Sequence, residues 1–198
     1  MTETRELPLF PLNTVLFPGG PLPLRIFEQR YLDMVRHCMR HDSGFGVVLI
    51  LRGREVGAGA ETVAVGTEAR IVDFSRLDGG LLGISCIGQQ RLRVIETRLQ
   101  PDGLLVGRVA DVPSDPPLAV PAEFRALADA ARRVVTELGQ VYERVERHFN
   151  DASWVGFRLS EVLPMAMPDK QALLEMSDPR RRLQQLSQLI LTSDNRSA

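Results

Sequence analysis

The first half of the chain carries short apolar runs separated by glycine-containing turns. Residues 45–51 form an apolar, β-branched run, and residues 81–87 form a similar run after Asp78-Gly79-Gly80. Runs of this length and composition predict buried strands, and the Asp-Gly-Gly sequence tolerates the positive φ angles of a tight hairpin turn. Shorter runs at 91–96 and 104–109 predict two further strands. Several short strands joined by turns favour an antiparallel barrel or sandwich.

One amphipathic helix is predicted within this half, from about Glu28 to His41. At 100° per residue, its apolar side chains fall into one stripe and its charged side chains take the other side. The stripe consists of Tyr31, Leu32, Val35, Cys38 and Met39.

The second half has the apolar spacing of helices. Apolar residues between 124 and 138 recur at steps of three and four, as on one face of a helix. Asp151 or Ser153 is placed to cap a second helix that runs through Leu163. Asp178-Pro179 supplies a cap and a first-turn proline for a last helix.

A proline-rich stretch separates the two halves, with the sequence VPSDPP at residues 112–117. Proline removes backbone donors from both helices and central strands, so this stretch is a plausible boundary. We therefore predict an α+β protein with a β-rich subdomain at residues 1–117 and a helical subdomain at residues 118–198.

Composition limits the classes of partner. The chain has 198 residues, 24 Lys and Arg against 25 Asp and Glu, and a formal net charge of -1. Such a balance lacks the positive excess that drives binding to phosphate backbones, so nucleic acid is not the expected partner. Two cysteines are too few for a disulfide-built secreted fold, and no apolar stretch has the length of a membrane helix. We expect a cytoplasmic protein without a membrane partner.

The opening segment is the most specific stretch of the chain. It reads LPLFPLNTVLFPG from Leu7, continues as LPLRIFE from Leu22, and ends with Arg30-Tyr31. This segment resembles the N-terminal, substrate-binding domain of Lon protease, and pieces at 65–71, 78–94 and 170–183 resemble later parts of the same family in order. Gln29 departs from a common proline and Leu92 from a common aromatic residue, which affects local surface shape only.

The resemblance implies a β-rich subdomain of the PUA-like type packed on a C-terminal helical bundle. It also implies a module that selects substrates and performs no catalysis. The chain has no G-x-x-x-x-G-K-[ST] loop for nucleotide phosphates, and nothing in it matches the family's Ser-Lys proteolytic dyad. We therefore expect a standalone bacterial form of the domain, without ATPase or protease activity.

Other candidate chemistry is weak. Asp33, His37 and His41 have a spacing that places ligands on one helical face, but Arg36 and Arg40 add positive charge there, so we expect a solvated face and no metal. The two cysteines lie in apolar surroundings and are expected to be core residues without a catalytic role. The glycine-rich stretch at 57–60 lacks a following helix, so no cofactor is predicted there.

The best functional candidate is the proline-rich opening. Its prolines stiffen the backbone, and a rigid aromatic surface suits peptide binding because little entropy is lost on contact. We expect Phe10 and Phe27 to fill the core and Phe17 to be exposed in the loop with Pro18. The predicted peptide contacts are Phe17, Pro18, Arg25 and Arg30, with the arginines attracting acidic segments.

The leading hypothesis is a binding module for unfolded proteins or peptides, recognised through apolar side chains and strand edges, that works with a protease or a chaperone. One alternative is RNA binding by analogy with PUA-like domains, which requires a continuous arginine patch. Another is an enzyme with an unrecognised site in a cleft between the subdomains.

Overall fold

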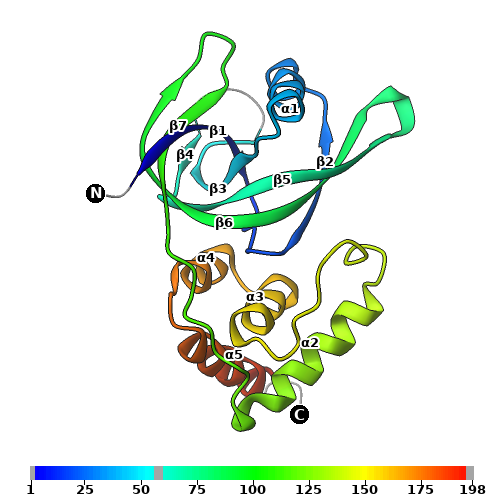
Figure 1. The fold of residues 1–198 in the computed structure, drawn as a ribbon, viewed down its shortest axis with the longest axis vertical. Coiled ribbons are helices and arrows are strands. Elements are labelled where there is room, and N and C mark those ends of the chain that lie inside the picture. The colour runs from blue at the N-terminus through cyan, green and yellow to red at the C-terminus, as the bar shows by residue number, and fades with distance from the viewer. Residues whose placement is uncertain (1–2, 56–59, 195–198) are drawn as a thin grey trace. The chain divides into compact units, whose positions relative to one another are not determined.

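The computed structural model describes residues 3–55 and 60–194, and the chain divides into two compact units, Met1–Pro113 and Ser114–Ala198. Strands lie in the first unit and most helices in the second, which confirms the predicted mixture of helix and sheet (Figure 1). The second unit begins within the proline-rich stretch, at Ser114, and the Asp115 carboxylate pairs with Arg182 of the same unit. Residues 57–59 of the glycine-rich stretch lie outside the described residues.

The first unit is a closed barrel with additional strands. Its strands in order are β1 (Thr4–Leu12), β2 (Pro21–Ile26), β3 (Phe45–Arg52), β4 (Glu61–Thr62), β5 (Val65–Arg76), β6 (Leu82–Leu99) and β7 (Leu105–Asp111). The pairings β1–β7, β7–β6, β6–β5 and β5–β3 are antiparallel, and a parallel β1–β3 pairing closes the ring. β2 pairs with β6, and β4 pairs with β3. Of the two predicted forms, the β1–β3 pairing makes this unit a barrel rather than a sandwich.

Helix α1 (Gln29–His41) packs its apolar stripe onto this barrel. Tyr31, Val35 and Cys38 are buried as predicted, and the Tyr31 ring stacks on Phe10 of β1 with centroids 3.9 Å apart. Met39 was predicted to belong to the stripe but is exposed, whereas Met34 is buried. Met34 lies three residues after Tyr31, on the centre of the same face, while Met39 lies at the edge of the stripe.

A long hairpin extends from the barrel. Strands β5 and β6 remain paired as far as Arg76 and Leu82, beyond their pairings with β3 and β7, and the 3₁₀ turn η1 (Asp78–Gly80) joins them (Figure 1). Gly79 and Gly80 have φ angles of 74° and 76°, which confirms the predicted turn chemistry. Residues 72–82 are called the arm below.

The second unit is helical throughout its described regular structure. It contains η2 (Ala122–Phe124), α2 (Arg125–Glu137), α3 (Ala152–Val162), α4 (Met167–Glu175) and α5 (Pro179–Asp194). α3 is buried along most of its length and packs against α2, α4 and α5. The predicted caps are confirmed, since the Asp151 carboxylate accepts the Trp154 N–H at 2.7 Å and the Asp178 carboxylate accepts the Arg180 N–H at 2.9 Å.

Candidate functional site

The predicted exposure of Phe17 is wrong. Its side chain is 0% exposed, because the loop that carries it folds back onto β6. Gly19 N–H donates to Gly88 O at 2.7 Å and Gly88 N–H donates to Gly20 O at 2.8 Å. A Cβ at Gly88 would lie 2.2 Å from Phe17 O, so only glycine permits this approach. Phe17 is therefore a buried residue rather than an exposed contact.

Arg30 is also buried, with 9% of its surface exposed, and is not an open contact for a client. Its Nη1 donates to Gly103 O at 2.7 Å, its Nη2 lies 2.9 Å from a Glu28 carboxylate oxygen, and its guanidinium covers the Tyr31 ring. The side chain thus joins the start of α1 to the turn before β7. Of the other predicted contacts, Pro18 is half-buried and Arg25 is exposed on β2.

The two other phenylalanines of the opening segment, Phe10 and Phe27, differ in exposure. Phe10 is buried as predicted, but Phe27 is 57% exposed. Phe27 follows the last paired residue of β2, Ile26, and precedes α1, so the sheet does not enclose it. Sequence reasoning assigned it to the core because it lies within an apolar run.

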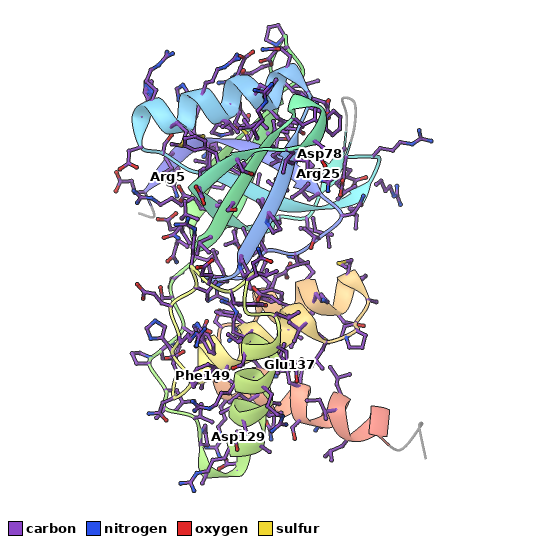
Figure 2. All side chains as sticks on the ribbon, turned by 90° about the vertical axis from the view of Figure 1, so that its right-hand side faces the viewer. Arg5, Arg25, Asp78, Asp129, Glu137 and Phe149 are labelled. Carbon is purple, nitrogen blue, oxygen red and sulfur yellow. The ribbon has the colours of Figure 1, made fainter. Side chains whose placement is uncertain are left out.

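Four exposed apolar side chains lie on the arm or directly beside it in the strand register. The set, called the arm patch, consists of Phe27, Val72, Phe74 and Leu81, with exposures of 57%, 38%, 65% and 39%. Phe27 and Leu81 directly flank the final β2–β6 pair, Ile26 with Leu82. Phe74 pairs with Ile84 of β6, two residues further along the same strand. Figure 2 views the first unit from the side on which the arm extends, and Arg25 and Asp78 lie on this side.

Sequence reasoning missed Phe74 and Val72. A signal was present, since IVDFSR at residues 71–76 keeps apolar residues close to the Asp78 turn. The strand is twelve residues long, and only its first part pairs with β3 inside the barrel. An apolar side chain in the last part therefore has no barrel core to enter.

The edge of β2 is closed to an added strand. In an antiparallel pair, every second residue of a strand bonds to its neighbour and the residues between direct their backbone groups outward. Gly88 N–H donates to Gly20 O, so the even-numbered residues of β2 bond to β6 and the odd-numbered residues face outward. The outward residues are Pro21, Pro23 and Arg25, and proline has no N–H to donate. Recognition through this strand edge, one of the predicted modes, is disfavoured.

Charges on the barrel are neutralised in pairs. The hydrogen bond from Arg98 lowers the pKa of the exposed Glu6 carboxyl, and neighbouring strands carry similar pairs. The ion pairs are Arg98 with Glu6, Arg108 with Glu96, Arg5 with Glu68 and Asp111, and Arg70 with Asp42. Mixed charges of this kind do not form the continuous cationic surface that a nucleic-acid backbone requires.

The groups suited to nucleophilic or acid–base chemistry serve the cores. Cys38 and Cys86 are each 1% exposed, and burial raises the pKa of the Cys86 thiol to about 12. In the second unit, Glu161 accepts bonds from Arg158 Nη2 at 2.8 Å and from Tyr142 OH at 2.9 Å. Burial raises the pKa of Glu161 to about 7, although the Arg158 charge lowers it. Both carboxyl oxygens already have partners, as in a structural carboxylate.

Neither a metal cluster nor a membrane span is found in the described part of the chain. Among residues 3–55 and 60–194, no three His, Cys, Asp or Glu side chains are grouped to hold a metal ion. None of the helices described there has the length and apolarity to cross a membrane. An open depression in the second unit is lined in part by His148 and Asp151. Asp151 caps α3, and His148 contacts Glu146, so the depression lacks a nucleophile with an adjacent base.

Comparison with known sequences and structures points to one family. A family model described as the ATP-dependent protease La (LON) substrate-binding domain matches residues 6–192. The crystal structure of a Lon N-terminal domain protein from Xanthomonas campestris is 40% identical, with a TM-score of 0.76, and covers 92% of this chain and 96% of that chain. The N-terminal domain of the Mycobacterium avium complex Lon protease gives a TM-score of 0.62 over the same shares, and its 20% identity supports the fold alone.

Curated relatives match through one part of their length. Lon protease 2 of Myxococcus xanthus is 29% identical over 191 residues, which are 93% of this chain and 23% of that protein. Protein cereblon of Xenopus tropicalis is 32% identical over 113 residues, which are 55% of this chain and 24% of that protein. The chain therefore spans about a quarter of the length of these relatives.

Proposed function

Because the chain belongs to the family of the ATP-dependent protease La (LON) substrate-binding domain, we propose that it is a non-catalytic module that binds unfolded proteins and apolar peptides. The single observation that carries this function is the arm patch, in which Phe74 and Phe27 are more than half exposed. Aromatic side chains bury a large area at a small entropic cost, which makes them effective anchors for a partner.

The arm patch suits clients that share apolar character rather than sequence. Phe74 stands on a paired strand, and Phe27 and Leu81 are each bonded to a residue of the last β2–β6 pair, so much of the surface is held in place before a client arrives. Because two of the three outward residues of β2 are prolines without an N–H, side-chain contact rather than addition of a strand to β2 is the proposed mode. Arg25 and Pro18 remain proposed contacts, with Arg25 attracting acidic residues beside the apolar segment of a client. Phe17 and Arg30 are buried and are therefore not proposed as contacts of a client.

The proposed partners of the chain are based on the descriptions of its family and relatives. Since the family is that of a protease's substrate-binding domain, the proposed setting is a cytoplasmic protease or chaperone to which clients are delivered. We also infer that the two units work together as one module, because the family match spans both of them. The sequence and the described sites support no ATPase or protease activity for this segment.

Fluorescence anisotropy tests this function. Labelled peptides from an unfolded protein, with and without aromatic residues, are titrated with the chain. Replacing Phe74 with serine removes an exposed anchor worth about 1–2 kcal/mol, so affinity should fall by about tenfold, and F27S together with F74S should lower it further. Both side chains are exposed, so stability should change by no more than about 0.5 kcal/mol.

A matched control is available on β6, the strand whose first residue belongs to the arm. Ile95 of β6 is 47% exposed but lies in the segment that pairs with β7. I95S should leave peptide affinity unchanged. Absence of saturable binding by the unsubstituted chain, or an equal loss in I95S, would contradict the proposal. Labelled RNA in the same assay tests the alternative, which requires binding that weakens steeply with salt.

A further inference from the structure

Helix α1 carries two histidines one turn apart on its exposed side. The rings of His37 and His41 stack with centroids 4.3 Å apart and planes 15° from parallel. Both residues are exposed, and the helix beneath them is held by Tyr31, Val35 and Cys38 in the core. Two imidazoles therefore lie face to face on a rigid support.

This spacing is close to what a single metal ion requires. Zn–N bonds are about 2.0–2.1 Å long, so two nitrogens bound to one ion at right or tetrahedral angles lie about 2.9–3.4 Å apart. Each imidazole binds a metal ion through a lone pair in its ring plane, so the two stacked rings must turn well away from parallel for their nitrogens to converge on one ion. Exposed histidines on one helical face, one turn apart, can make this turn through changes of χ1 and χ2. Neutral imidazole is also the commonest protein ligand for such ions.

Neighbouring charges define the type of site. Asp33, one turn before His37, accepts bonds from Gln29 Nε2 at 2.9 Å and Arg36 Nη1 at 2.7 Å, so it is engaged elsewhere. The exposed cations Arg36 and Arg40 lie on the same helix and weaken the attraction for a metal ion without blocking either ring. The histidines therefore offer two ligands rather than three.

The sequence alone led us to expect no metal on this helical face, but the approach of the two rings changes that expectation. We propose that His37 and His41 form a two-ligand site for a borderline divalent transition-metal ion, with Zn²⁺ as the probe. Water, or a donor from a second molecule, completes the coordination shell. Imidazole suits these ions better than it suits Mg²⁺ or Ca²⁺, which prefer oxygen ligands. The thiols of Cys38 and Cys86 do not compete, because both are buried in the core of the first unit.

Calorimetric titration of the full chain with Zn²⁺ tests the site, and the third histidine provides a matched control. The chain has three histidines, and His148 lies in the second unit. H37Q and H41Q should each weaken binding by on the order of a hundredfold, because the second imidazole no longer binds at high effective concentration. H148Q should bind as the unsubstituted chain does.

Two further measurements separate a site from a general charge effect. Imidazole NMR signals of His37 and His41 should shift together on adding Zn²⁺, while those of His148 stay in place. R40Q should tighten binding by a few-fold, because it removes a like charge beside the ion. Unchanged binding in H37Q or H41Q, an equal loss in H148Q, or no saturable binding by the unsubstituted chain overturns the proposal.

Discussion

Replacing Asp115 with asparagine probes how the second unit holds its first segment. Arg182 of α5 is 0% exposed, and its Nη1 lies 2.7 Å from Asp115 Oδ2, whose side chain is 3% exposed. The Arg182 Nε donates to Leu173 O at 3.0 Å, and its Nη2 donates to Met176 O. The Ser153 hydroxyl donates to the same Asp115 oxygen at 3.0 Å. The carboxylate thus joins the chain after Pro113 to two helices.

The expected loss follows from these contacts. Removing one partner of a buried ion pair destabilises a protein by about 3–5 kcal/mol, because the remaining charge is left without compensation. Two carbonyls and the Phe157 ring, 4.1 Å from the guanidinium carbon, still stabilise Arg182. Asparagine also keeps an oxygen for the Ser153 hydroxyl. The loss in D115N should therefore be about 3 kcal/mol, a large share of the roughly 5–15 kcal/mol that stabilises a folded domain.

Trp154 makes the measurement specific to the second unit. It is the only tryptophan in the chain and lies in α3, so its fluorescence during urea unfolding reports on that unit. D115N should lower the midpoint with little change in slope.

An exposed ion pair supplies the control for this experiment. Arg180 pairs with Glu123 at 2.7 Å, and both side chains are about half or more exposed. E123Q should therefore change stability by less than about 1 kcal/mol. A loss below about 1 kcal/mol in D115N would refute this account of the buried pair.

Two further predictions concern other parts of the fold. Burial raises the pKa of Glu161 from 4.5, its ordinary value, to about 7 in the folded protein. Protonation of Glu161 therefore adds to the free energy of unfolding, in full below about pH 4.5 and less and less as the pH rises through 7. The free energy of unfolding should fall by about 3 kcal/mol over this pH range. E161Q should flatten the pH dependence of urea unfolding, and an unchanged pH profile in E161Q would contradict the prediction. G88A places a Cβ 2.2 Å from Phe17 O and should destabilise the first unit by about 1–3 kcal/mol in thermal unfolding, whereas Q89A at the next, exposed position should be near neutral. Equal stability of G88A and the unsubstituted chain would show that the loop can move away from β6.

The sequence indicated the candidate site only in part. It indicated the proline-rich opening, where Arg25 is exposed. It also predicted an exposed Phe17 and a buried Phe27, and the structure shows the reverse. Both rings lie in apolar runs, and periodicity alone does not say where a strand leaves the core. Phe17 is buried by a close approach to Gly88, a residue 71 positions later in the chain. Such contacts between distant segments leave no local pattern to read.

The local elements were determined by the sequence itself. Apolar periodicity identified α1 and α2, and the capping residue Asp151 identified the start of α3. Asp178 and Gly79-Gly80 likewise indicated a cap and a turn, because these features depend on neighbours within one or two turns of chain. Tertiary structure decided what depends on distant partners. The parallel β1–β3 pairing closed the barrel, and the length of β5 beyond β3 left Phe74 without a core to enter. Burial is a property of the surrounding chain, so the surface proposed for binding became visible only when the strands were placed side by side.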